Sequence, residues 1–229
     1  MAQTDVLQTQ SEVKFNRFLA LVYLVMSLGL AITALVSSAV SSNEEFVSRI
    51  FFNPWLTFGL FILQIVIVVA LSGAVMRMSS GAAFLLFILY SALTGVSLSS
   101  IFLYYSQTTI AYTFWVTAGM FLFSSVIGLF IRRDISAAGR FLLIALMGWL
   151  FAMFLSWFFP SAAGFNQAMT FVGILLFAGL TVWDTQRLKQ VSTQLEGSKG
   201  MGGMVVIGAL VLYLDFINLF LLMLRTSRR

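Results

Sequence analysis

Two carboxylates stand in stretches that otherwise have the composition of membrane helices. Asp215 lies within "LYLDFINLFLLMLR", residues 212–225, and Asp184 ends the apolar run "GLTVWD". An ionised carboxylate at the centre of a bilayer costs about 2.5–3.5 kcal/mol on the insertion scale. Each side chain must therefore face the protein interior, meet a partner or carry a proton. A carboxyl group that exchanges its proton near neutral pH is able to act as a proton sensor.

Each candidate residue also has a purely structural interpretation. Asp215 can be a protonated or hydrogen-bonded structural residue, because Asn218 lies three residues further on the same helix face and can serve as its partner. Asp184 follows Trp183, as at an ordinary membrane interface, and the structural interpretation has more weight there. Arg77 ends the run "VVALSGAVMR". A positive-inside anchor is its simplest interpretation, and an ion-pair partner for the aspartates is the functional one.

The residue types that are missing exclude several kinds of chemistry. The chain has neither cysteine nor histidine. It therefore lacks disulfides, thiolate nucleophiles and iron–sulfur ligands, together with the commonest general base and metal ligand. The three lysines, Lys14, Lys189 and Lys199, lie in polar segments, so no lysine in a membrane helix is available for a retinal Schiff base. We expect no enzyme activity and no bound cofactor.

The composition is that of an integral membrane protein. Of the 229 residues, 60% are hydrophobic and only 9% are charged, against about 25% charged residues in an average soluble domain. The net charge of +5 comes from basic residues spread over short connections, so it does not indicate a nucleic-acid partner. The expected partner is the lipid bilayer. A transmembrane helix needs about 20 apolar residues, and seven stretches qualify: 18–40, 54–76, 82–104, 110–131, 141–159, 168–184 and 204–224.

The domain organisation follows from these stretches. We expect one helical membrane domain, residues 18–229, preceded by a polar N-terminal tail, residues 1–17. The first apolar run is longer than the 7–15 residues of a signal-peptide core, so it is predicted to be a true helix. The third stretch contains "SALTGVSLSS", residues 91–100, which is rich in small and hydroxylated residues. Close helix packing is the favoured interpretation of that run, and pore lining is the alternative.

The basic residues predict the orientation. With the N-terminus in the cytoplasm, the inner segments hold nine lysines and arginines and the outer segments hold four. This bias favours a cytoplasmic N-terminus. Seven crossings then place the C-terminus in the periplasm, although the final "RTSRR" would by itself prefer the cytoplasm.

Three of these segments resemble the Bax inhibitor-1 family, also called the transmembrane Bax inhibitor motif family, and its bacterial branch in particular. "LYLDFINLFLLMLR" resembles the signature of the family's final helix. "WDTQRLK", residues 183–189, resembles the sixth-helix motif, and "YSALTGVSLSSIF", residues 90–102, resembles the third-helix pattern. The similarity covers nearly the whole chain. It implies an all-α fold of seven transmembrane helices in which the last helix is central and the other six wrap around it.

The resemblance also implies roles for individual residues. Asp184 and Asp215 would form a hydrogen-bonded pair near the cytosolic side, a pH-dependent latch on a calcium leak pathway, and Arg77 would be the partner of that latch. Gln64 stands where some members of the family have an acid, so a further acidic calcium site is not expected. Calcium prefers six to eight oxygen ligands. The two carboxyls are therefore predicted to form a weak transit site for Ca²⁺ rather than a tight site.

Three functions are compatible with the sequence. The first is a pH-sensitive leak channel or slow transporter for a cation, with calcium favoured, in the bacterial inner membrane. The second is a membrane regulator that transports nothing and binds membrane proteins such as a quality-control protease or stress-response proteins, with the N-terminal tail as a handle. The third is a proton-coupled transporter of another solute.

One geometric difficulty accompanies the predicted pair. At 1.5 Å per residue, Asp215 lies about 16 Å from the cytosolic start of its stretch, whereas Asp184 lies about 6 Å from the same boundary. A mismatch of about 10 Å must be absorbed by helix tilt or by a later start of the last helix.

Overall fold

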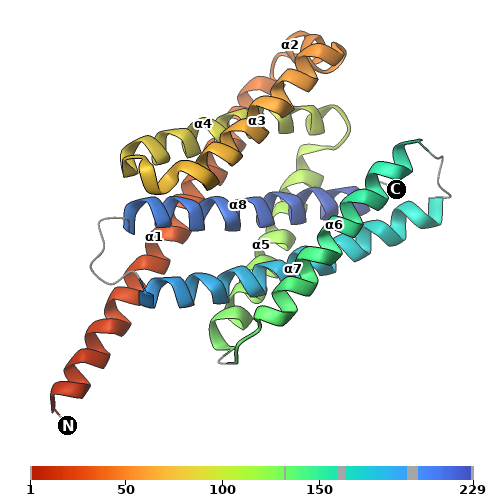
Figure 1. Cartoon of the computed structure of the whole chain (residues 1–229). Helices are drawn as coiled ribbons and strands as arrows, with labels where there is room; N and C mark the ends of the chain where they lie inside the picture. Colours follow the sequence, from red (N-terminus) through yellow and green to blue (C-terminus); the bar gives the residue numbers. More distant parts are fainter. Residues whose placement is uncertain (1, 132, 159–162, 195–200, 228–229) are drawn as a thin grey trace. The chain divides into compact units, whose positions relative to one another are not determined.

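The structure, a computed structural model, describes the chain except for residues 1, 132, 159–162, 195–200 and 228–229 (Figure 1). Its described residues form helices joined by short connections, without strands. Arg132, Lys199, Arg228 and Arg229, four of the basic residues that predict the orientation, lie outside the described residues. The elements in chain order are α1 (Ala2–Ser41), α2 (Glu44–Phe51), α3 (Pro54–Ala74), η1 (Val75–Arg77), α4 (Ser80–Leu98), η2 (Ser99–Leu103), α5 (Gln107–Phe130), α6 (Ser136–Phe158), α7 (Ala163–Gln194) and α8 (Met201–Thr226).

Seven segments of the described chain are long and apolar enough to cross a membrane. They are Arg17–Ser41, Pro54–Ala74, Ser80–Leu103, Gln107–Phe130, Ser136–Ser156, Gly164–Ser192 and Met201–Thr226. The prediction of an all-α membrane protein with seven transmembrane helices is therefore confirmed. The largest difference concerns the sixth stretch, predicted as 168–184, because α7 continues to Gln194 through a polar segment.

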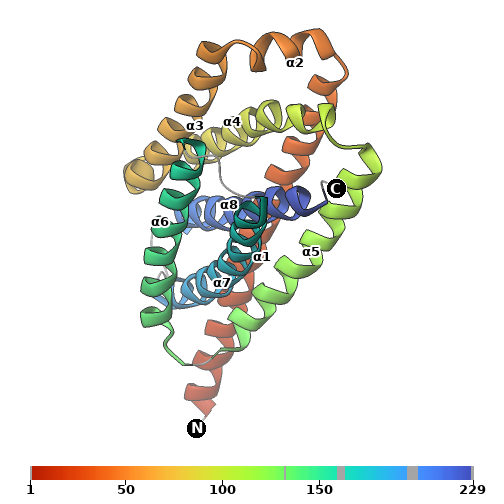
Figure 2. The same cartoon turned by 90° about the vertical axis from the view of Figure 1, so that its right-hand side faces the viewer.

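The N-terminal half contains two features that hydropathy alone does not predict. Helix α1 begins at Ala2, so the segment predicted as a polar tail is helical and continuous with the first span. The short helix α2 follows, between the end of α1 and the start of α3 (Figure 2). Asn43 caps it by accepting a hydrogen bond from the Phe46 amide at 3.0 Å, and Glu45 pairs with Arg49 at 3.0 Å. An asparagine cap and acidic residues in the first turn are ordinary start signals of a helix.

The chain folds into two compact units, which share the last helix. The first unit contains residues 1–106 and 191–213, which are α1 to α4 and the first half of α8. Within it, α4 packs along α1 and α3 (Figure 1). A methyl group added to Gly95 would lie 2.8 Å from the Thr33 carbonyl oxygen, and one added to Gly29 would lie 2.6 Å from the Phe87 ring. Small residues on both helices, Gly29 of α1 and Gly95 of α4, therefore allow α1 and α4 to approach closely.

The second unit contains residues 107–190 and 214–229, which are α5, α6, most of α7 and the second half of α8. Glycines again mark the close approaches. A methyl group at Gly128 of α5 would overlap the Val182 carbonyl oxygen of α7, and one at Gly139 of α6 would overlap the Trp183 ring. Since these contacts involve backbone atoms or a large ring, α7 is held tightly against both of its neighbours.

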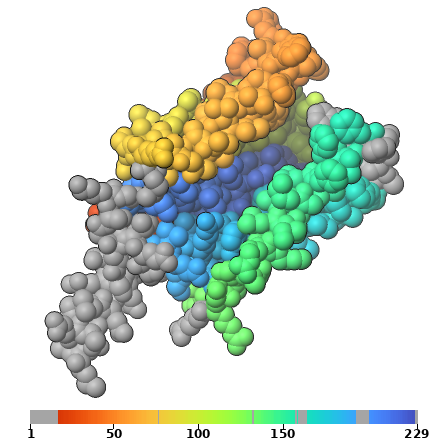
Figure 3. Space-filling model, viewed as in Figure 1, coloured from red at the N-terminus to blue at the C-terminus, as the bar shows by residue number. Residues whose placement is uncertain are grey.

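Helix α8 differs from the other spans in its burial. In its most apolar window 67% of the residues are buried, against 6% for α6 and at most 39% for any other span. Helix α6 lies at the surface in the space-filling view (Figure 3). It exposes large apolar side chains, which include Phe141, Ile144, Met147 and Phe151. Helix α8 contributes its first half to one unit and its second half to the other. A helix covered by protein in this way can carry a carboxyl group that never faces lipid.

Candidate functional site

The structure brings Asp184 of α7 and Asp215 of α8 together in the second unit. Both side chains are buried, with 8% and 5% of their surface exposed. Their carboxyl groups lie within hydrogen-bonding reach of each other. We call Asp184 and Asp215 the carboxyl pair. It is the only cluster of buried acids among the described residues.

A hydrogen bond between the two carboxyl groups needs a shared proton. Asp215 Oδ2 is shielded from solvent, and no N–H or O–H group of the described residues donates to it. An ionised carboxylate can only accept hydrogen bonds. Two facing carboxyls therefore bond to each other only when one of them is protonated. When both are ionised, the pair becomes two adjacent negative charges in a poorly solvated site, which repel each other strongly.

Aromatic side chains pack α8 against α5 beside Asp215 in sequence. The Phe216 ring lies 5.4 Å from the Phe114 ring and 5.6 Å from the Phe121 ring, measured between centroids. Phe216 and Phe121 are themselves buried. These ring contacts hold the second half of α8 against α5 within the second unit.

Polar side chains of α7 fix the position of Asp184 by binding the end of α5. The last carbonyl groups of a helix have no partner within the helix. Lys189 Nζ donates to the Leu129 carbonyl at 2.9 Å, and Gln186 Nε2 donates to the carbonyls of Ile131 and Arg133. The polar segment that follows Asp184 therefore caps a neighbouring helix, which explains why α7 continues beyond the predicted end of its apolar stretch.

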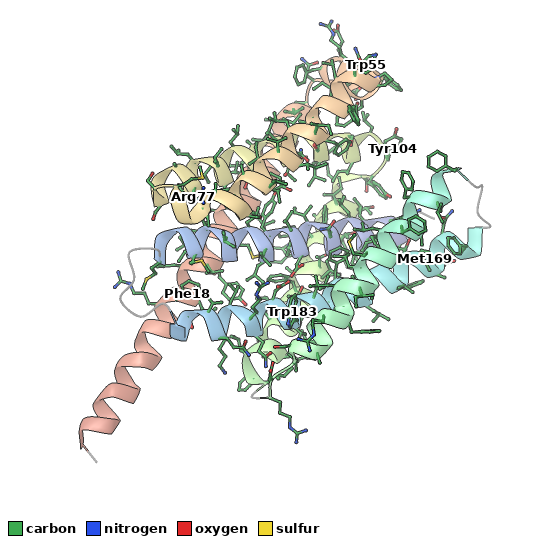
Figure 4. All side chains as sticks on the ribbon, viewed as in Figure 1. Phe18, Trp55, Arg77, Tyr104, Met169 and Trp183 are labelled. Carbon is green, nitrogen blue, oxygen red and sulfur yellow. The ribbon has the colours of Figure 1, made fainter. Side chains whose placement is uncertain are left out.

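Arg187 brings a positive charge to the pair, a role that the sequence did not reveal. It lies three residues after Asp184 on the exposed side of α7 and interacts electrostatically with that carboxyl. Its guanidinium carbon lies 5.6 Å from the centre of the Trp183 ring. The Trp183 side chain, labelled in Figure 4, packs against Gly139 of α6. The spacing of three residues between an acid and an arginine on one helix was the signal available.

Two further residues predicted for the site occupy different positions. Asn218 is half-buried, and its amide donates to the Leu214 carbonyl of its own helix at 2.8 Å. Its predicted support of Asp215 stays a prediction. Arg77 ends η1 in the first unit, with an exposed side chain (Figure 4). Because the carboxyl pair lies in the second unit, the predicted role of Arg77 as a latch partner also stays a prediction.

The expected mismatch along the membrane normal becomes smaller in the structure. Helix α7 ends at Gln194 and α8 begins at Met201. Asp184 then lies about 15 Å from that end of its helix, and Asp215 about 21 Å from the start of its own. Counted from these two ends, the difference is about 6 Å instead of the expected 10 Å.

The described residues contain no group of three or more acids, histidines or cysteines that would hold a metal ion tightly. Two carboxyls offer at most four oxygen atoms, fewer than the six to eight that Ca²⁺ takes in a stable site. The chemistry available here is proton exchange, together with brief electrostatic attraction of a cation when the pair is ionised.

Fold and site together define a class: a seven-span helical membrane protein with a buried carboxyl pair between its sixth and last spans. Comparison with known sequences gives the family. The family model described as "Inhibitor of apoptosis-promoting Bax1" matches residues 15–227. The chain therefore belongs to the Bax inhibitor-1 family, as the motifs of the third, sixth and last spans predicted.

Bacterial relatives match almost end to end. The inner membrane protein YbhL of Escherichia coli K12 is 40% identical over 218 residues, which cover 94% of this chain and 93% of YbhL. A protein of Borreliella burgdorferi is 41% identical over 223 residues, 96% of each chain. A membrane protein of Streptococcus pyogenes serotype M6 is 35% identical over 226 residues, 98% of this chain and 97% of its own.

Proposed function

We propose that this protein is a pH-sensitive leak pathway for cations, with Ca²⁺ as the favoured ion, in which the carboxyl pair is the gate. The observation that supports this proposal best is the buried contact between Asp184 and Asp215, whose hydrogen bond needs a proton. A purely structural polar contact in a membrane helix is made more safely by uncharged groups, since ionisable residues there are expensive.

The sign of the pH response follows from the charges at the pair. At low pH a shared proton holds Asp184 and Asp215 together, and α7 and α8 are closed against each other. As the pH rises the proton leaves, and two carboxylates face each other with Arg187 as the neighbouring cation. Their repulsion separates the helices, and the same two charges attract a divalent cation. Flux is therefore expected to increase with pH.

The decisive experiment measures ion entry into liposomes that contain only the purified protein. A calcium-sensitive dye inside the vesicles reports entry across a series from about pH 5 to about pH 9, the range in which buried carboxyl groups exchange protons. Flux above that of protein-free liposomes, increasing with pH, is expected. Absence of flux at every pH would reject transport and favour a regulator. Flux of another solute driven by a proton gradient would favour a coupled transporter.

The regulator remains the second candidate because of α1. This helix begins at Ala2, whereas the first span begins at Arg17. About four turns of helix therefore precede the span, and this segment is the proposed site of contact with another membrane protein. Removal of residues 2–14 separates the two functions, because a leak pathway would keep its flux whereas a regulator would lose its partner.

We also propose that the protein resides in the inner membrane, as the name of the YbhL relative suggests, with a cytoplasmic N-terminus and a periplasmic C-terminus. A C-terminal alkaline phosphatase fusion should then be active, and a C-terminal green fluorescent protein fusion should be dark. The opposite pair of results would place the end of α8 in the cytoplasm, and the carboxyl pair would be reached from the other side.

A further inference from the structure

The short helix α2 lies within the first unit and has no part in the proposed gate. It connects the end of α1 at Ser41 with the start of α3 at Pro54 (Figure 2). Because α1 and α3 are consecutive membrane spans, the two ends that α2 connects lie at one boundary of the bilayer. The third span runs back to this boundary and ends at Leu103, and its last segment, η2, contacts α2 there. The spans therefore place α2 at the edge of the membrane, whichever side the N-terminus occupies.

The two sides of α2 differ in polarity. At about 100° per residue, its apolar residues share one side of the helix: Phe46, Val47, Ile50 and Phe51. Its polar residues share the other side: Glu44, Glu45, Ser48 and Arg49. A helix with one apolar side and one charged side, at the edge of a bilayer, is typical of segments that lie in the plane of the membrane–water interface.

The protein covers only part of the apolar side. Val47 is fully buried, and Thr57 Oγ1 of α3 donates a hydrogen bond to the Ile50 carbonyl at 2.9 Å. These contacts fix α2 against the neighbouring spans of its own unit. Phe46, at the edge of the apolar side, remains 47% exposed. The apolar side of α2 therefore has an open edge that the described residues do not cover.

Further aromatic side chains are exposed at the same end of the first unit. Phe52 follows α2, Trp55 begins α3 and Tyr104 follows η2, and all three are exposed. Trp55 and Tyr104 are labelled in Figure 4. Tryptophan and tyrosine are enriched where a membrane meets water. From Trp55 the exposed apolar surface continues along α3 through Phe58, and only 11% of the most apolar window of α3 is buried. The exposed edge of α2 is therefore continuous with a surface that faces lipid.

We propose that α2 is an interfacial helix that binds the headgroup layer of zwitterionic phospholipids. Phe46, Phe52 and Trp55 insert at the level where headgroups meet acyl chains, and the charged side of α2 faces water. Anionic lipids are recognised by clustered lysines and arginines. Helix α2 instead carries two acids and one arginine, and Arg49 pairs with Glu45 at 3.0 Å. This binding requires neither the carboxyl pair nor any ion flux.

The test uses the absence of cysteine from the chain, because a single introduced cysteine then carries a spin label at one known position. Phe46→Cys places the label on the apolar edge of α2, and Glu44→Cys, the matched control, places it at an exposed position on the charged side. The labelled full-length proteins are reconstituted in phosphatidylcholine vesicles. Collisions with oxygen, which concentrates in lipid, and with a water-soluble nickel chelate give the depth of each label.

The label at position 46 should lie about 10 Å deeper than the label at position 44, because a helix with its side chains is about 10–12 Å wide. Phe61→Cys, further along α3, provides the reference for the lipid core. If Phe46→Cys does not fold, Phe52→Cys takes its place and should also be deeper than Glu44→Cys.

Three results would overturn the proposal. Equal contact of the labels at positions 44 and 46 with the nickel chelate would place α2 in water. A label at position 46 that neither reagent reaches would show that protein, such as a second copy of this chain, covers the apolar edge. A deeper label in vesicles that also contain phosphatidylglycerol would show that anionic headgroups attract the helix. Because none of these measurements uses transport, a protein without flux would reject the proposed function and leave the interfacial helix in place.

Discussion

The two halves of α8 bury polar side chains with different chemistry. Within the first unit, Tyr213 forms an uncharged hydrogen bond with Thr33 among packed rings. Within the second unit, Asp215 faces another carboxyl, and its Oδ2 has no donor among the described residues. A contact between hydroxyl groups does not depend on pH in the physiological range. A hydrogen bond between two carboxyl groups needs a proton, which is why the proposed pH response is assigned to the second half of α8.

An unsatisfied polar atom alone does not distinguish Asp215. The hydroxyls of Tyr23 and Ser37, both in α1, are also buried without a partner among the described residues. A neutral hydroxyl without a partner costs some stability but does not become charged near neutral pH. The carboxyl group of Asp215 differs because it is buried, has an oxygen without a donor and lies beside a second carboxyl group. The proposed gate rests on this combination.

The largest expected effect comes from removing the exchangeable proton of Asp215, the feature that distinguishes the two halves of α8. In Asp215→Asn the amide donates permanently to Asp184, so the pair stays closed without a titratable proton. We expect the pH dependence of flux to disappear and flux to stay at its low-pH level. Asp184→Asn should behave in the same way. The measurement is calcium entry into liposomes across the same pH series.

Two controls keep this prediction specific. Circular dichroism and the size-exclusion profile should be unchanged, because asparagine has the shape of aspartate. Asp215→Ala removes the contact altogether and should give flux that is high at every pH. A pH profile of Asp215→Asn that matches the wild type would show that the pair is not the sensor.

The second prediction concerns the packing that holds α7 in the second unit. Gly128→Ala places a methyl group on the Val182 carbonyl oxygen, and the backbone cannot move away cheaply. We expect a loss of about 1–3 kcal/mol in the free energy of unfolding. Gly119, on the same helix, has open space where a methyl group would be added. Gly119→Ala should keep or slightly raise stability, because alanine favours helix more than glycine does.

Unfolding of both α5 variants in a detergent titration measures the difference. If Gly128→Ala were as stable as Gly119→Ala, α5 and α7 would be more loosely packed than the structure indicates. Asp184 would then be positioned by its polar neighbours alone.

Much of this architecture could be predicted from the sequence, and the two features that were not predicted were missed for different reasons. The number of spans followed from apolar length, and the meeting of Asp184 with Asp215 followed from the family resemblance. The capping of α5 by Gln186 and Lys189 was not predictable, because a backbone carbonyl at a helix end carries no residue-type signal. Helix α2 was missed, although Asn43 and the charges around it are common signals of a short helix.

The third prediction tests that unexpected capping. Gln186→Ala removes the amide that donates to the Ile131 and Arg133 carbonyls. Hydrogen bonds between membrane helices contribute about 0.6 kcal/mol on average and at most about 1.7 kcal/mol, so the loss of stability should fall in this range. Gln107→Ala, at an exposed position at the start of α5, is the matched control and should cost less. A cost of Gln186→Ala no larger than that of Gln107→Ala would argue against the capping role.

The smallest effect is expected from an acid outside the membrane spans. Asp134 is exposed in the connection before α6 and accepts hydrogen bonds from the amide and hydroxyl of Ser136. These bonds, followed by the charge of Arg140, lower the pKa of Asp134 below its usual value. A carboxyl group whose pKa is lowered by folding stabilises the folded protein at pH values above its pKa in the unfolded chain. That stability is lost only as the pH falls through the pKa of the folded state.

Asp134 therefore stays ionised across the whole pH range in which the carboxyl pair is proposed to respond. Asp134→Asn should leave the pH midpoint of flux unchanged and lower stability only slightly, because the asparagine side-chain oxygen can accept the same two hydrogen bonds from Ser136. A shifted midpoint in Asp134→Asn would show that charges at the ends of the spans contribute to the pH response, and the carboxyl pair in the second half of α8 would no longer be sufficient to explain it.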